Sequence, residues 1–279
     1  MFLLQLKSSA RSLAMHALAF MLVLAATSHA FALGASPLGT DLASWWQFDE
    51  GSGNTAADAS GLGNNGYLQG EVAFTQDSLM GTALDFTGPS GTFIVPHNPS
   101  LEPATGTIEV WVKVAALQNS DILTKLTSLW VRTNYPCGCS VYGLRITENG
   151  SVYAFVGNND PTDPFSPWRT AESEPGLITS EEWHHLVMRW DGSMIAVFVD
   201  GVLRGATPYD PVPDIGLSYY NGSDLVVGAG TAWGGPQLPH EFVGQMDDVR
   251  FYGRALSDTE IMTDYVSRGH KPATPRKPR

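Results

Sequence analysis

Cysteine is nearly absent from this sequence of 279 residues, which contains only Cys137 and Cys139. With no histidine nearby, two cysteines supply too few ligands for a zinc site at that place. Gly138 separates them, and its permissive backbone dihedrals can bend the chain enough to bring both sulfurs within bonding reach. We predict a short disulfide at a loop tip; two free thiols, or a bond to another chain, are the alternatives.

Basic residues are also scarce, with 16 Lys and Arg against 28 Asp and Glu. Two of the 16 lie in residues 1–33 and five in residues 268–279, where no acid occurs, so nine remain in the body against 28 acids, a net charge of −19. Such a surface repels polyanions and attracts cations, which argues against nucleic acid as a partner. Residues 269–279 are basic and proline-rich, so we predict a disordered tail.

Long apolar runs are absent after residue 33. Before it, Lys7 and Arg11 precede an apolar run over residues 13–26, followed by small residues around Ala30 and Ala32. These are the three parts of a secretory signal peptide, so we predict that residues 1–33 are cleaved and that the mature protein is secreted, or periplasmic or on the cell surface if the source is bacterial. The alternative is an uncleaved anchor, because residues 13–33 approach the roughly 20 apolar residues that span a bilayer. We expect no membrane span after cleavage.

Helical periodicity is nearly absent from the body, which consists of short strand-like runs divided by Gly, Asn, Asp and Pro. In residues 107–114, Ile108, Val110, Val112 and Val114 alternate with Glu109, Trp111 and Lys113. This alternation is typical of a strand with one face in a core. About 230 residues of this kind predict one all-β domain, a sandwich or barrel of antiparallel strands. The other predicted strands are residues 45–48, 83–86, 93–95, 129–132, 142–147, 152–156, 183–190, 194–199, 225–227 and 242–252.

Two hairpins and one short helix complete this prediction. The dipeptides Asn-Gly at 149–150 and Asp-Gly at 191–192 separate paired strand runs, where a tight turn needs residues that tolerate positive φ. Near the end of the body, Ser257 and Glu260 have the spacing of a capping box. Ile261 and Tyr265 then share one face of the predicted helix, which we expect to cover an edge of the sandwich.

Three segments, in this order, resemble the laminin-G-like jelly-roll family, which has the concanavalin-A-like fold. They are residues 46–53 with 58–66, residues 182–187 with 190–192 and 197–201, and residues 242–252 with 254–257 and 260–261. The resemblance implies a jelly-roll β-sandwich of two antiparallel sheets over residues 34–268, in which the first and last strands pair side by side. Trp183 and Trp190 should anchor its core.

The resemblance also implies a structural calcium ion. Residues 58–65 mix oxygen-bearing side chains with glycines, as a hard cation requires. We predict Asp58, Asn65 and Asp247 as its ligands, with Asp247 arriving nearby if the terminal strands pair. The alternative is that Asp58 and Asn65 only tie their own turns through side-chain-to-backbone hydrogen bonds.

Aromatic residues in Gly-, Pro-, Asn- and Asp-rich loops indicate a binding face. Aromatics held on loops by a rigid scaffold suit stacking against sugar rings, although several can simply pin loops. We predict that Trp168, Tyr219, Tyr220 and Trp233 contact a ligand.

An enzyme of the same fold is the main rival hypothesis. Retaining glucanases need two carboxylates about 5 to 5.5 Å apart, but Glu109 has only Trp111 and Lys113 as same-face neighbours on its strand. The chain has no run typical of a lyase, and His184 and His185 suit structural roles. We therefore expect an exported, noncatalytic module that binds a glycan or an extracellular protein; a glycan-active hydrolase or lyase, or a purely structural surface protein, is the alternative.

Overall fold

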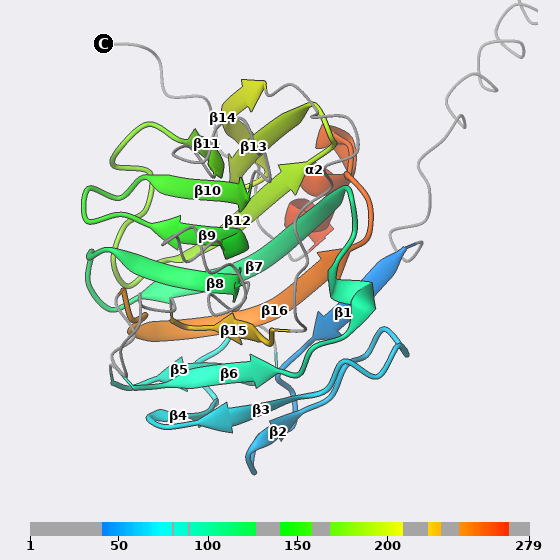
Figure 1. The fold of residues 1–279 in the computed structure, drawn as a ribbon. Helices are drawn as coiled ribbons and strands as arrows, with labels where there is room; N and C mark the ends of the chain where they lie inside the picture. Colours follow the sequence, from blue (N-terminus) through cyan, green and yellow to red (C-terminus); the bar gives the residue numbers. More distant parts are fainter. Residues whose placement is uncertain are drawn as a thin grey trace, which may run out of the picture. The chain divides into compact units, whose positions relative to one another are not determined.

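The structure, a computed structural model, describes residues 41–79, 81–88, 90–126, 140–157, 168–208, 223–229 and 240–267. These residues form two eight-stranded antiparallel sheets (Figure 1). The first sheet runs in the order β14 (Val202–Pro208), β13 (Met194–Val199), β12 (Trp183–Trp190), β7 (Gly106–Val114), β16 (Gly244–Tyr252), β5 (Ala83–Phe86) and β4 (Val72–Thr75), with β1 (Leu42–Trp46) also paired to β16. The second runs in the order β11 (Trp168–Glu172), β10 (Val152–Gly157), β9 (Ser140–Ile146), β8 (Ser120–Leu126), β15 (Leu225–Val227), β6 (Thr92–Val95), β3 (Gly66–Gln69) and β2 (Thr55–Ala56). A 3₁₀ turn, η1 (Pro99–Leu101), and one helix, α2 (Asp258–Ser267), complete the described elements.

The pairing of the two terminal strands is confirmed. Trp46 lies opposite Val249 and Trp45 opposite Arg250 in the β1–β16 ladder, and Figure 1 shows blue β1 beside orange β16. Both hairpins are confirmed as well, with β9 paired to β10 and β12 to β13. Gly150 and Gly192 have φ values of 76° and 91°, a region that side chains with a Cβ rarely adopt.

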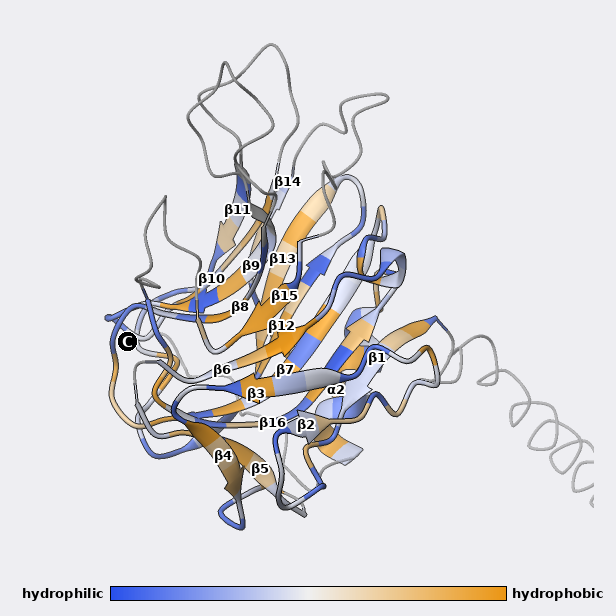
Figure 2. Cartoon of the chain, turned by 60° about the horizontal axis from the view of Figure 1, so that its bottom comes forward, coloured by the Kyte–Doolittle hydropathy of each residue, from blue (hydrophilic) through white to orange (hydrophobic). Residues whose placement is uncertain are grey.

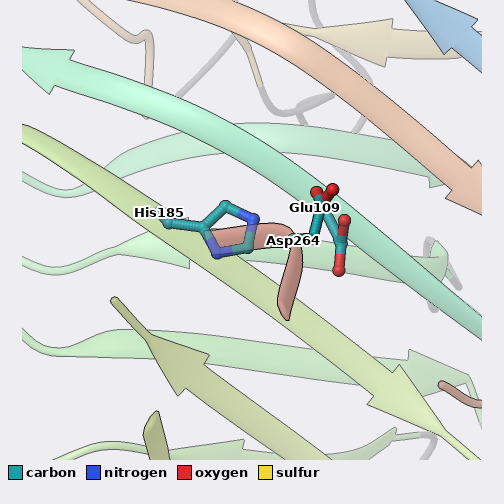
Figure 3. A group of neighbouring side chains, drawn as sticks. All are labelled: Glu109, His185 and Asp264. Carbon is teal, nitrogen blue, oxygen red and sulfur yellow. The ribbon is translucent and has the colours of Figure 1, made fainter. Parts of the chain in front are cut away.

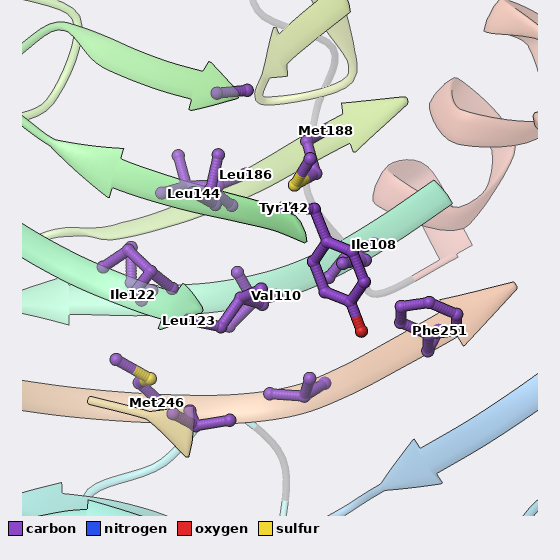
Figure 4. Close-up of a cluster of buried hydrophobic side chains, with 14 of the residues drawn as sticks. Ile108, Val110, Ile122, Leu123, Tyr142, Leu144, Leu186, Met188, Met246 and Phe251 are labelled. Atoms are coloured by element: carbon purple, nitrogen blue, oxygen red, sulfur yellow. The ribbon is translucent and has the colours of Figure 1, made fainter. Parts of the chain in front are cut away.

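The core lies between the sheets and is built from alternate residues of the central strands (Figure 4). Ile108, Val110, Val112 and Val114 are at most 2% exposed, as their alternation predicts. Strand β13 is apolar along its whole length and is coloured as hydrophobic in Figure 2. Trp190 is fully buried and stacks on Tyr142 with ring centroids 5.4 Å apart. Trp183 is only half-buried, because it begins its strand at the margin of the core.

The helix packs against the outer face of the first sheet rather than against an edge. Leu256 and Ile261, just before and within α2, form a second apolar cluster with Val187 of β12 and Phe198 of β13. This extra layer buries the side of β7 that the alternation assigned to solvent, and Glu109 and Trp111 are each 1% exposed.

The capping box at the start of α2 is confirmed. The Ser257 hydroxyl accepts the Glu260 N–H at 3.3 Å, and Glu260 Oε2 accepts the Ser257 N–H at 2.8 Å. Arg254 Nη2 also donates to Glu260 Oε1 at 2.7 Å. These donors, Arg254 first, lower the pKa of Glu260 to about 2, against the desolvation that raises it.

Several strands have no clear signal in the sequence. Six strands were not predicted from the sequence: β2, β3, β4, β8, β11 and β14. Each is short, polar or exposed, and backbone hydrogen bonds to neighbouring strands hold it in its sheet. The predicted strand at 129–132 lies outside the described residues. Among the described helices, none is long and apolar enough to span a bilayer.

We expect Leu186→Ala to lower the free energy of unfolding by about 2 to 5 kcal/mol, because Leu186 is fully buried and its loss leaves a cavity. Leu203→Ala is the matched control: Leu203 is 42% exposed, so its truncation should cost less than about 0.5 kcal/mol. Denaturant unfolding measures both, and equal effects would contradict the placement of the core.

We expect Glu260→Gln to destabilise the protein at pH 7 by about 1 to 2 kcal/mol, since it weakens charge-assisted hydrogen bonds. Because the pKa of Glu260 is lower in the folded state than in the unfolded state, ionised Glu260 stabilises the fold fully above the ordinary pKa range of glutamate. This stabilisation is lost as the pH falls toward 2. The difference from the parent should therefore shrink between about pH 4.5 and pH 2. Exposed Glu148→Gln is the control and should change little at any pH.

Candidate functional site

A row of polar and aromatic side chains crosses the outer face of the second sheet. In β9 and β10, Tyr142, Leu144, Val152 and Ala154 face the core, so by strand alternation the residues between them face outward. The ladders align Asp121 of β8 with Arg145 of β9, Arg145 with Tyr153 of β10, and Tyr153 with Glu172 of β11. We call Asp121, Arg145, Tyr153, Phe155 and Glu172 the outer-face platform.

Arg145 and Asp121 form a two-pronged ion pair in this platform. Arg145 donates from Nε to Asp121 Oδ1 at 2.6 Å and from Nη2 to Oδ2 at 3.2 Å. Burial raises the pKa of Asp121, and the guanidinium opposes that shift. The Arg145 side chain is 28% exposed and spends two of its five N–H donors on Asp121. It can therefore offer hydrogen bonds to a molecule on this face.

The aromatic part of the platform lies beside that ion pair. Phe155 packs against Gly143, where a Cβ would collide with the end of its ring. Tyr153 is half-buried, with its ring centroid 6.1 Å from that of Phe155. Exposed Glu172 accepts the Ser151 hydroxyl at 2.6 Å. A ring flanked by a guanidinium and carboxylates can both stack against and hydrogen-bond to a polar ring such as a sugar.

The loop aromatics predicted from the sequence are only partly placed. Trp168 begins β11, and its backbone pairs with Gly157. Tyr219, Tyr220 and Trp233 lie outside the described residues, as do Cys137 and Cys139. The sequence interpretation missed the platform because its members are far apart in the chain and resemble ordinary strand residues. The available signal was the alternation Tyr153-x-Phe155 opposite Gly143.

Two of the three predicted calcium ligands lie in one turn. Asp58 Oδ1 accepts the N–H groups of Trp45 and Ser60, both at 2.9 Å. Asp58 Oδ2 accepts the Asn64 N–H at 2.9 Å and the Ser60 hydroxyl at 2.8 Å, while Asn65 Oδ1 accepts the Asp58 N–H at 2.8 Å. A carboxylate has about four lone-pair positions, and donors of this chain use all four at Asp58. This geometry suits a turn-forming carboxylate better than a metal ligand.

The third predicted ligand comes from the opposite end of the domain. Asp247 is 2% exposed in β16, and its Oδ2 accepts the Leu79 N–H at 3.2 Å. Asp58 bridges to Trp46, which pairs with Val249, two residues beyond Asp247. The pairing of terminal strands thus brings the two segments into the same part of the sheet. Calcium binding itself stays a prediction.

The two adjacent histidines have structural surroundings. His184 Nδ1 lies 3.0 Å from Asp200 Oδ2, and its Nε2 accepts the Thr179 N–H at 3.2 Å. His185 is fully buried and packs beside the rings of Trp111 and Tyr265, at centroid distances of 4.9 and 6.0 Å, while those two rings stack on each other at 5.6 Å. Neither environment suits a solvent-accessible general base.

Comparisons with known proteins agree with this architecture. Residues 87–262 match the family described as the concanavalin A-like lectin/glucanases superfamily. Usherin from mouse is 24% identical over 156 residues, which is 56% of this chain, and human usherin is 26% identical over 179 residues, 63% of this chain. The matched region is only 3% of the length of either usherin.

Solved structures share the fold at low identity. Domain 4 of AbnA, an extracellular arabinanase of Geobacillus stearothermophilus, in complex with arabinotriose, matches with a TM-score of 0.56 and 17% identity, covering 80% of this chain and 97% of that domain. The ligand-binding domain of botulinum neurotoxin serotype D, in complex with N-acetylneuraminic acid, matches with a TM-score of 0.59 and 9% identity, covering 82% and 51%. The binding domain of Paraclostridial mosquitocidal protein 1 matches with a TM-score of 0.58 and 14% identity, covering 83% and 53%.

We expect calcium, compared with a chelator, to raise the midpoint of thermal unfolding, because a ligand bound only by the folded state stabilises it, by about 2.7 kcal/mol at about 100 times its dissociation constant. If Asp58 is a ligand, as the sequence predicts, Asp58→Asn abolishes that response; the four donors that Asp58 already accepts predict instead that the response is kept and that only the midpoint falls. If the midpoint is the same in calcium and in chelator, yet Asp58→Asn still lowers it, Asp58 serves only its turn and the metal prediction is wrong.

Proposed function

The chain belongs to the concanavalin A-like lectin/glucanase superfamily, and from this premise we propose that it is an exported, noncatalytic module that binds a glycan through the outer-face platform. The observation that carries the proposal is the cross-strand row Asp121, Arg145, Tyr153 and Glu172. It combines an aromatic ring with charged hydrogen-bonding groups on rigid strands. This is the combination that fixes a sugar ring by stacking and orients its hydroxyls.

The structural neighbours support a glycan as the ligand. Domain 4 of the arabinanase was solved with arabinotriose, and the ligand-binding domain of the neurotoxin was solved with N-acetylneuraminic acid. The strongly acidic body of this chain favours neutral over polyanionic glycans, because like charges repel. The predicted leader, residues 1–33, supports encounter with such ligands outside the cell.

The spacing of the platform carboxylates supports a noncatalytic role. Asp121 and Glu172 are separated by three strand spacings of about 4.8 Å each, about 14 Å in all. Glycosidases need carboxylates about 5 to 9.5 Å apart. A closer pair, Glu109 and Asp264, is at most 3% exposed, so a polysaccharide cannot reach it without a large rearrangement. Hydrolysis or elimination on a glycan remains the second candidate function, with this fold as its support.

We expect the purified chain to bind at least one neutral glycan on a glycan array without releasing products from a polysaccharide panel. Tyr153→Ala and Arg145→Ala should each weaken that binding at least about tenfold, which corresponds to about 1.4 kcal/mol. Titration calorimetry with the best array ligand measures the loss. Trp168→Ala tests the loop aromatic predicted from the sequence in the same assay.

Tyr67→Ala is the matched control, because Tyr67 is a 39% exposed tyrosine in β3 of the same sheet, away from the platform. It should leave the affinity unchanged. Binding that survives both platform variants would refute this site, and product release would refute the noncatalytic role. Binding to an extracellular protein but to no glycan would replace the ligand class.

A further inference from the structure

A buried cluster under α2 has no part in the proposed glycan site. Glu109 of β7, His185 of β12 and Asp264 of α2 are 1%, 0% and 3% exposed. One ligand-type atom from each lies within 4.8 Å of those of the other two. Figure 3 shows the three side chains turned toward one another from three separate elements. The cluster therefore spans the junction between the helix and the sheet.

Among the described residues, one cation, Arg250, faces the carboxylates of this cluster. Arg250 donates from Nη1 to Asp264 Oδ1, and its Nη2 lies 3.2 Å from Asp248 Oδ2. One guanidinium thus faces three buried carboxylates, those of Glu109, Asp248 and Asp264, which leaves two negative charges when all are ionised. Buried charge is tolerated only when it is paired or bound to a metal.

Three oxygen atoms in the cluster lack a hydrogen-bond donor among the described residues. They are both carboxylate oxygens of Glu109 and Oδ2 of Asp264. Two adjacent carboxylates in an interior need a shared cation, which is either a proton or a metal ion.

We propose that Glu109, His185 and Asp264 bind a divalent first-row transition ion such as zinc, which fastens α2 to the outer face of the first sheet. One imidazole and two carboxylates are a donor set that suits such ions. The two positive charges of the ion would offset the two negative charges that remain when all three carboxylates are ionised. The ion would also bind the carboxylate oxygens that lack a hydrogen-bond donor among the described residues. Trp111 and Tyr265 both pack against the imidazole of His185 and fix its place in the cluster.

The geometry requires only a modest adjustment. Zinc bonds nitrogen and oxygen at about 2.0 to 2.2 Å, so tetrahedral ligand atoms lie roughly 3.4 Å apart. Atoms now up to 4.8 Å apart must approach by up to about 1.4 Å, which rotations of the Glu109 and Asp264 side chains can supply. Because the site is closed to solvent, its role is structural, and the ion adds its binding free energy to that of folding.

The test is zinc retention by the full chain after incubation with zinc chloride at pH 7.5 and desalting, measured by elemental analysis. We expect about one zinc ion per chain and a higher thermal midpoint than in chelator. Glu109→Gln and His185→Gln should each lower occupancy at least about tenfold. Near-UV circular dichroism verifies that the variants keep their packing, and Glu109→Gln removes a charge at nearly constant volume.

His97→Gln and Glu148→Gln are the matched controls, since these side chains are partly or fully exposed away from the cluster. Both should retain zinc like the parent. If the parent retains less than about 0.1 zinc per chain and zinc leaves its midpoint unchanged, the shared cation is a proton and the proposal is wrong. Zinc that persists in folded Glu109→Gln and His185→Gln would place the metal elsewhere and refute it equally.

Discussion

The antiparallel pairing of β1 with β16 is the constraint on which the domain depends. Strand β16 also pairs with β5 and β7, so it joins both ends of the chain to the centre of the first sheet. Side chains reinforce this junction: the Trp45 indole donates to Asp248 at 2.5 Å, and the Arg250 guanidinium lies 4.8 Å from the centroid of the Trp45 ring. The ladder between β16 and β7 is irregular between Asp247 and Arg250, and Asp248 has a φ of 51°. This irregularity places Asp248 where both Trp45 and Arg250 reach it.

The helix adds a third layer that changes the chemistry of the first sheet. Without α2, Glu109 and His185 would lie on a solvent-facing surface, where charges are screened and therefore cost little free energy. With α2 in place they are enclosed together with Asp264, and Arg250 joins the helix to the strand through Asp264. Because burial removes water from both ions, a buried ion pair stabilises the fold only when the geometry of the pair offsets that desolvation cost. The charges beneath α2 therefore define where the helix docks, while the apolar cluster of Val187, Phe198 and Ile261 supplies the burial.

In the second sheet, strand register brings together side chains from separate strands on the outer face. Its outer face carries no helix among the described residues; there Arg145, Tyr153 and Glu172 are partly or fully exposed, whereas Asp121 and Phe155 are buried. The register places a guanidinium, a phenol and two carboxylates in one line from four strands. Rigid strands hold these groups without further ordering, which reduces the entropic cost of binding. Among the described residues, the two outer faces thus differ in that α2 covers the first and no helix covers the second.

The meeting of the terminal strands was expected from the family resemblance, whereas the sequence by itself determined the all-β class, both hairpins and the capped helix. Each of these has a local cause: alternation in residues 107–114, glycine in tight turns, and the spacing of Ser257 and Glu260. The family's three segments added the order in which the strands close. These features are encoded within a few residues, so one sequence is enough to predict them.

Only the tertiary structure decided which side chains share a site. Glu109 is the single acid of its strand in the sequence. In the folded structure α2 brings Asp264 next to it, from a position more than half of the domain's length away in sequence. Asp121 and Glu172 joined Arg145 and Tyr153 through the register of four strands, which no local pattern specifies. Asp58 was predicted to be a metal ligand from its sequence context. Only the folded turn shows that its carboxylate accepts hydrogen bonds from three backbone N–H groups and one hydroxyl. Local propensity acts between neighbours in sequence, whereas a site depends on long-range pairing and on which surface a later element covers.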